Sequence, residues 1–147
     1  LLQEKHDLKL TVLIGHNATI IPELSKLSAQ FESLNVLGPI SNMAQTLWEH
    51  DAVICSGGVT LHEAIAVGTP AFAVNQLEHQ QTKAQFVENS GAAINLGLGN
   101  QYDAEKLRKA LNFRKPKLES MSLQAKQLID GRGIFRVIDT MGKLIKI

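Results

Sequence analysis

The chain has 147 residues, of which 44% are hydrophobic and 20% are charged, and its formal net charge is +1. This is the composition of an ordinary globular domain, and the near-neutral charge argues against a nucleic-acid partner. No apolar run approaches the ~20 residues of a membrane span. The single cysteine, Cys55, excludes an intrachain disulfide and fits a reducing compartment. We therefore expect a cytoplasmic protein that binds no nucleic acid and has no membrane span.

Apolar runs alternate with amphipathic segments along the whole chain. The expected strands cover 10–14, 35–37, 52–55, 71–74 and 92–96, and the expected helices cover 22–31, 41–50, 59–67, 78–89, 104–111, 118–129 and 134–145. The strand runs are apolar throughout, as in parallel strands that are covered on both faces. Their alternation with helices predicts an α/β fold, a Rossmann-like parallel sheet with helices on both faces, in one domain over residues 1–147.

The strongest functional signal lies in residues 51–81, where a strand ends in Ser56, Gly57 and Gly58 and a helix follows at once. Backbone amides at a helix start can hold a phosphate, and glycines let the anion come close. The hydroxyl of Ser56 or Thr60 would add a hydrogen bond. A tight turn that needs glycine for its backbone geometry and binds nothing is an equally good interpretation. The turn is neither a Walker loop nor the three-glycine dinucleotide fingerprint.

Glu63 lies one turn into that helix, among small and apolar residues. A carboxylate in such a setting is costly to bury unless it is paired. The two hydroxyls of a ribose would pair it through charge-assisted hydrogen bonds. The alternative is a solvent-facing acid near the helix start, where the helix dipole favours a negative charge.

His79, Gln80 and Gln81 follow the next strand and are expected beside the same crevice. Amide side chains both donate and accept hydrogen bonds, which suits sugar hydroxyls, although a polar helix start on the surface explains them equally well. A serine-hydrolase elbow is excluded because residue 54 is isoleucine. Cys55 near His62 is interpreted as a packed residue and not as a nucleophile. The histidines show no metal-ligand spacing, so we expect no metal and no cofactor.

Residues 51–81 resemble the donor-binding segment of GT-B glycosyltransferases, in particular the family that includes the peptidoglycan N-acetylglucosaminyltransferase. The shared elements are Asp51-Ala52-Val53-Ile54, Ser56-Gly57-Gly58, Thr60 with Glu63, Gly68-Thr69-Pro70 and Gln80-Gln81. The tail over 125–137 resembles the C-terminal end of the spore-coat polysaccharide and pseudaminic-acid branch of the same fold. That branch contains UDP-sugar hydrolases.

The resemblance implies donor contacts to the diphosphate from Gly57, Gly58 and Thr60, to the ribose from Glu63, and to the sugar from Gln80 and Gln81. From their places beside these residues, Ser56 is expected at the diphosphate and His79 at the sugar. A GT-B enzyme works in the cleft between two Rossmann-like domains, and this chain resembles the second of them. The catalytic residues are therefore expected in an N-terminal domain, on the same or a separate chain, and the isolated chain is expected to be inactive. Because it begins with Leu1 and lacks the first glycine loop of that half, we expect it to be truncated at its N-terminus.

Together these observations predict the UDP-sugar-binding half of a GT-B enzyme of bacterial surface polysaccharide or nonulosonic sugar biosynthesis, of the hydrolase-like type. One alternative is the donor domain of a glycosyltransferase of the peptidoglycan type. A second, non-enzymatic alternative is a binding subunit that needs a separate partner chain. In that case Met43, Trp48 or the final helix would form an apolar contact surface, whereas otherwise these residues close the core.

Overall fold

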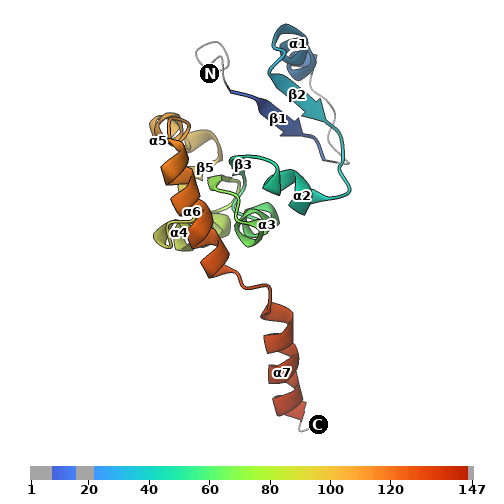
Figure 1. The fold of residues 1–147 in the computed structure, drawn as a ribbon, viewed down its shortest axis with the longest axis vertical. Coiled ribbons are helices and arrows are strands. Elements are labelled where there is room, and N and C mark those ends of the chain that lie inside the picture. The colour runs from blue at the N-terminus through green and yellow to red at the C-terminus, as the bar shows by residue number, and fades with distance from the viewer. Residues whose placement is uncertain (1–7, 16–21, 146–147) are drawn as a thin grey trace. The chain divides into compact units, whose positions relative to one another are not determined.

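A computed structural model describes residues 8–15 and 22–145. The contacts within the chain separate two compact units, residues 1–42 and residues 43–147. The described strands are divided accordingly between two parallel sheets, one in each unit (Figure 1). The prediction of one sugar-nucleotide-binding domain over 1–147 stays a prediction.

The first unit consists of β1 (Leu10–Leu13), α1 (Pro22–Gln30) and β2 (Leu34–Leu37). The two strands pair in parallel, with Leu10 opposite Leu34. Helix α1 begins at its proline, where the missing N–H costs little, and contacts β2. The unit is a small β–α–β element, as the alternating pattern predicts.

The sheet of the second unit has the order β3 (Val53–Cys55), β4 (Ala71–Asn75) and β5 (Ala93–Leu98), all parallel. The central strand, β4, is the most deeply buried, because both of its faces are covered. The register between β4 and β5 is irregular between Ala73 and Asn75, at the carboxyl end of β4. This is the edge of a parallel sheet where ligand sites form.

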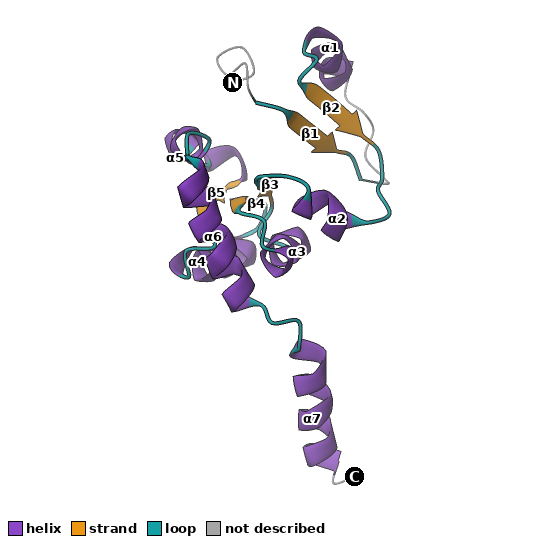
Figure 2. Ribbon diagram, in the orientation of Figure 1, coloured by secondary structure: helices purple, strands orange, loops and turns teal. Residues whose placement is uncertain are grey.

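Helices lie around this sheet (Figure 2). In chain order they are α2 (Met43–Trp48), α3 (Val59–Val67), α4 (Glu78–Asn89), the 3-10 turn η1 (Gly99–Gln101), α5 (Ala104–Ala110) and α6 (Lys115–Leu128). The last helix, α7 (Gly133–Ile145), follows α6 and is not packed against the sheet. Alternate residues of β4 pack into two hydrophobic clusters, with Ala71 and Ala73 in one and Phe72 in the other. Helices on both faces of parallel strands confirm the predicted α/β class.

Several local predictions are confirmed. Helices α3 and α4 have the predicted bounds, and α3 ends at Gly68, whose φ of 85° is left-handed and favours glycine. Asp103 is the N-cap of α5, because its side chain accepts a hydrogen bond from the Lys106 backbone amide at 2.8 Å. The helix expected over 41–50 is shorter and covers Met43–Trp48.

The apolar residues considered for a contact surface fall into two groups. Met43 packs against the core, whereas Trp48 is 70% exposed. Helix α7 has no buried residue in its described part, and seven of its apolar side chains are exposed: Ile134, Phe135, Val137, Ile138, Met141, Leu144 and Ile145. The interpretation that these residues close the core is therefore correct for Met43 and wrong for Trp48 and α7. None of the described helices has the length and apolar character needed to cross a membrane.

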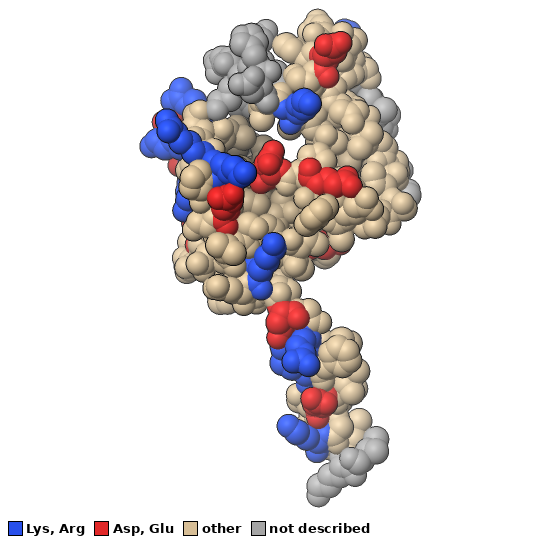
Figure 3. Space-filling model, viewed as in Figure 1, with Lys and Arg blue, Asp and Glu red and all other residues tan. Residues whose placement is uncertain are grey.

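Charged side chains of both signs lie close to one another on the face shown in Figure 3, along the body of the chain and along α7. This mixture agrees with a formal net charge of +1. That face therefore has no large patch of a single sign.

Candidate functional site

The glycine turn joins β3 to α3 at the carboxyl edge of the second sheet. Gly58 is the N-cap of α3, with no side-chain cap hydrogen bond, and His62 returns from the next turn to donate from Nδ1 to the Gly58 carbonyl at 3.0 Å. The first amides of α3 are thus left without a capping side chain in the described part of the chain. Free amides at the positive end of a helix dipole are suited to an anion.

The two glycines of the turn are required to different degrees. Gly57 is buried, and a Cβ atom there would lie 2.6 Å from the Gln80 carbonyl oxygen and closer still to Asn75 Oδ1. A Cβ atom on Gly58 would make only ordinary contacts, at 3.5 Å to Ser56 Oγ and 3.6 Å to Gln80 Nε2. Gly57 is therefore needed for close packing of the turn, and Gly58 is free of that constraint.

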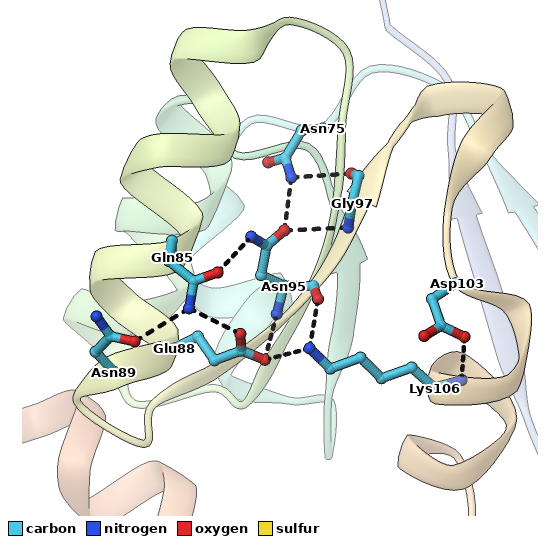
Figure 4. Close-up of polar contacts among 8 residues, drawn as sticks. All are labelled: Asn75, Gln85, Glu88, Asn89, Asn95, Gly97, Asp103 and Lys106. Atoms are coloured by element: carbon cyan, nitrogen blue, oxygen red, sulfur yellow. Dashed lines mark hydrogen bonds and ion pairs between the residues drawn. The ribbon is translucent and has the colours of Figure 1, made fainter.

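An amide network around Asn75 and Asn95 lies next to the turn, because Asn75 Oδ1 is close to Gly57. Figure 4 shows the contacts of this network. Asn75, at the end of β4, is 0% exposed, and its Nδ2 donates to Asn95 Oδ1 at 2.8 Å and to the Gly97 carbonyl at 3.0 Å. The Gly97 amide donates to the same Asn95 oxygen at 3.1 Å, and Asn95 Nδ2 donates to Gln85 of α4 at 3.2 Å. The ends of β4 and β5 are thereby joined to α4.

An ion pair extends the network to α5. Glu88 Oε1 accepts hydrogen bonds from Lys106 Nζ at 2.7 Å and from the backbone amide of Asn95 at 3.0 Å. The same Lys106 ammonium donates to the Asn95 carbonyl at 2.8 Å. The side chains of Glu88 and Lys106 and the backbone of Asn95 therefore connect α4, α5 and β5.

The network has one buried atom without a hydrogen-bond partner among the described residues, Asn75 Oδ1. This oxygen lies where a side chain on Gly57 would have to be. The network is therefore in direct contact with the glycine turn, through Asn75 and Gly57. Neither Asn75 nor Asn95 was predicted as a site residue from the sequence. Asn75 directly follows the apolar run 71–74, and a polar residue in that position indicates the carboxyl end of a strand, where ligand sites form.

The remaining predicted ligand residues belong to the turn and to α3. Ser56 of the turn and Thr60 and Glu63 of α3 are half-buried. The structure gives the Glu63 carboxylate neither an ion pair nor a hydrogen bond within the described residues, on a helix whose other inward side chains are apolar. A half-buried, unpaired carboxylate one turn from the glycines is available to accept hydrogen bonds from a ligand.

The three predicted residues on α4, His79, Gln80 and Gln81, have different surroundings. Gln80 lies against the glycine turn, His79 is exposed, and Gln81 faces an open depression of about 610 Å³. One face of α4, from Glu78 to Asn89, lines this depression together with Leu98. The structure therefore brings Gln80 to the turn and places Gln81 at a second location.

Cys55 ends β3 directly before the turn, and burial raises the pKa of its thiol to about 12. The thiol is therefore neutral near pH 8, which supports a packing role. We expect alkylation by iodoacetamide at pH 8 to be slower by about tenfold or more in the folded chain than in urea, because burial raises the thiol pKa and so lowers the fraction present as the reactive thiolate. Equal rates in the two conditions, followed by mass spectrometry, would contradict this interpretation.

Comparison with known proteins defines the class to which this fold and turn belong. The family model described as the glycosyltransferase family 28 C-terminal domain matches residues 1–133. The chain belongs to this family. The resemblance of the sequence to the C-terminal domain of GT-B glycosyltransferases is thereby confirmed.

Particular relatives are found in bacteria. The chain is 36% identical over 100 residues to the spore coat polysaccharide biosynthesis protein SpsG of Bacillus subtilis, covering 66% of this chain and 30% of that protein. It is 33% identical over 123 residues to the UDP-N-acetylglucosamine–N-acetylmuramyl-(pentapeptide) pyrophosphoryl-undecaprenol N-acetylglucosamine transferase of Methylibium petroleiphilum, covering 78% of this chain and 33% of that protein. The chain spans about a third of the length of these relatives.

A solved structure supports the same fold. The glycosyltransferase SnogD from Streptomyces nogalater matches with a TM-score of 0.55 and 22% identity, over 81% of this chain and 30% of that chain. The fold is thus a Rossmann-like half of a GT-B glycosyltransferase. At this identity the likeness concerns the fold alone.

Proposed function

We propose that this chain binds the donor of a GT-B enzyme, a UDP-sugar, with the diphosphate at Ser56, Gly57, Gly58 and Thr60. The observation that carries the proposal is the uncapped start of α3 at the carboxyl edge of a parallel sheet, inside the family 28 match. The relative from Methylibium petroleiphilum has UDP-N-acetylglucosamine in its name, which supports uridine as the base. Glu63 would accept hydrogen bonds from the ribose.

The Glu63 assignment is tested by calorimetric titration of the chain with UDP. Replacing Glu63 by alanine should weaken UDP binding by about 1.5–3 kcal/mol, because charge-assisted hydrogen bonds to the ribose hydroxyls are lost. ADP and GDP titrations report on the base. Glu119→Ala, which removes an exposed acid on α6, is the control and should bind UDP like the original chain. Equal affinity of the Glu63 variant would remove the ribose role.

For the reaction, we propose a hydrolase-like activity that releases the sugar to water, with a base supplied by an N-terminal domain. The proposal rests on the similarity to SpsG and on the resemblance of the tail over 125–137. The similarity to an N-acetylglucosamine transferase favours the alternative, transfer to an acceptor. Incubation of a protein that carries both halves with a UDP-sugar and no acceptor separates the two, because only a hydrolase accumulates free sugar together with UDP.

The non-enzymatic alternative is a binding subunit that meets a separate chain. The exposed apolar residues of α7 and Trp48 favour it over a closed monomer. Size-exclusion chromatography at several concentrations, with and without a candidate N-terminal domain, tests this alternative. A mixture that elutes as two separate species argues against it.

A further inference from the structure

A bulge in β5 lies beside Asn75. In the ladder between the strands, Ala73 of β4 is opposite Asn95 of β5. Asn75, two residues further along β4, is opposite Leu98, which is three residues further along β5. The extra length contains Gly97, whose φ of 93° is left-handed and favours glycine. At this bulge the backbone groups of Gly97 are bonded to side chains, since its carbonyl accepts from Asn75 Nδ2 and its amide donates to Asn95 Oδ1.

The Gly97 backbone determines which way the Asn75 amide is turned. A carbonyl only accepts and an N–H only donates, so exchanging Oδ1 and Nδ2 of Asn75 would bring two acceptors together at Gly97. The same exchange on Asn95 would bring donors together, because its Oδ1 accepts both from the Gly97 amide and from Asn75 Nδ2. The oxygen of Asn75 is therefore the end of the amide that the network leaves over, and it lies against Gly57.

Gly57 is confined by two groups that are themselves fixed. Asn75 Oδ1 lies where a Cβ atom of Gly57 would be, and the Gln80 carbonyl oxygen is 2.6 Å from the same position. Asn75 is 0% exposed and bonded to β5, whereas the Gln80 carbonyl is part of the α4 backbone. Neither group can withdraw without breaking hydrogen bonds. The turn therefore cannot collapse toward β4 or α4.

The oxygen that touches Gly57 lowers the stability of the fold. Asn75 Oδ1 has no hydrogen-bond partner among the described residues, and a buried acceptor without one is unfavourable. A small apolar residue would end β4 without this cost, as Ala71 and Ala73 do earlier in the strand. Local features that oppose stability are concentrated at functional sites. The turn that Asn75 contacts is such a site in the proposed function.

We infer that Asn75 is a positioning residue of the diphosphate site. Through Gly57 it holds the start of α3 in the geometry in which the uncapped amides bind the anion. Gly58, the N-cap of α3, directly follows Gly57, so a displacement of Gly57 is passed to the first amides of the helix. Asn75 is fully buried and does not itself touch the ligand. The inference rests on the proposed UDP-sugar function and adds to it a residue outside the predicted site.

The inference is tested with Asn75→Ala, which removes the oxygen at Gly57 and the donor to Gly97. UDP affinity, measured by calorimetry at a temperature at which circular dichroism shows the variant to be folded, should fall about tenfold, within the range of coupling between contacting residues. The backbone amide signals of Gly57 and Gly58 should also shift in the 15N spectrum of the ligand-free variant, because the turn has moved.

Met121→Ala separates positioning from stability. Met121 of α6 is 0% exposed and belongs to the hydrophobic cluster around Phe72. Its replacement leaves a cavity and lowers stability, but the folded variant should bind UDP like the original chain. If Asn75 contributed to stability alone, the Asn75 and Met121 variants would have the same UDP affinity.

Asn95→Ala tests the anchoring of Asn75 and replaces Asn75→Ala if that variant does not fold. It keeps the oxygen at Gly57 but removes the acceptor of Asn75 Nδ2, so UDP affinity should again fall. The double variant should bind about as weakly as Asn75→Ala alone, because both act through one network. Unchanged UDP affinity in the folded variants, or a loss of affinity with unshifted Gly57 and Gly58 signals, would overturn the inference. Absence of UDP binding by the original chain would overturn the proposed function, a result distinct from binding that survives the Asn75 substitution.

Discussion

Replacing Asn75 by aspartate should lower the free energy of unfolding by about 3–5 kcal/mol, the cost of leaving a buried charge without a partner. Asn75 is 0% exposed, and its Nδ2 donates to Asn95 Oδ1 and to the Gly97 carbonyl. The substitution puts a second acceptor opposite these two oxygens and removes both hydrogen bonds. Urea unfolding followed by circular dichroism measures the loss as a lower midpoint at constant slope.

The matched control is Asn89→Asp at the end of α4. Asn89 is exposed, and its Oδ1 accepts from Gln85 Nε2 at 3.0 Å, which a carboxylate also does. We expect a change within about 1 kcal/mol, mostly from a negative charge at a helix C-terminus. Similar losses in the two variants would show that the buried network does not matter to stability.

The effect at position 75 should depend on pH. Burial disfavours the charged carboxylate, so its pKa in the folded state is raised above the ordinary aspartate value of about 3.9. The variant therefore loses stability as the pH rises from about 3.9, the pKa of the unfolded aspartate, to the higher pKa of the folded state. The deficit relative to the original chain should therefore be smaller at pH 3 than at pH 7. An equal deficit at both values would point to lost hydrogen bonds alone.

The second large effect is expected from Gly57→Ala. The added methyl group would lie 2.6 Å from the Gln80 carbonyl oxygen and would overlap Asn75 Oδ1. Both obstacles are held in place, one by the α4 backbone and the other by the buried network, so the turn itself must move. We expect a loss of about 1–3 kcal/mol in stability, as for other overpacked sites, together with loss of UDP binding.

Gly58→Ala is the control for the stability part of this prediction, because its added methyl group would meet only contacts of 3.5 and 3.6 Å. Urea unfolding and UDP titration of both variants compare a crowded with an open position in one turn. Equal stability of the two variants would contradict the tight packing of Gly57. Retained UDP binding by Gly57→Ala would contradict the placement of the diphosphate at this turn.

The parts of the fold that depend on neighbouring residues could be predicted from the sequence. Helix α3 has the predicted bounds because a glycine turn precedes it and Gly68 stops it in a left-handed conformation. Asp103 caps α5 through the amide three residues later. Such signals act within one turn of chain, so a single sequence contains them in full.

The contacts that connect distant residues could not be predicted in the same way. Asn75 and Asn95 are 20 residues apart and meet because β4 and β5 are neighbours. The different surroundings of Gln80 and Gln81 depend on where α4 begins and on what packs against each of its faces. The apolar pattern over 134–145 likewise predicts a helix with an apolar face, but it does not reveal whether another surface covers that face.

The most direct test of the account is an NMR titration of the 15N-labelled chain with UDP. The central claim is that the amides at the start of α3 hold the diphosphate, so the largest shifts should occur at Gly57, Gly58, Val59 and Thr60. Saturable shifts elsewhere with these amides unchanged, or no shifts at millimolar UDP, would contradict the claim.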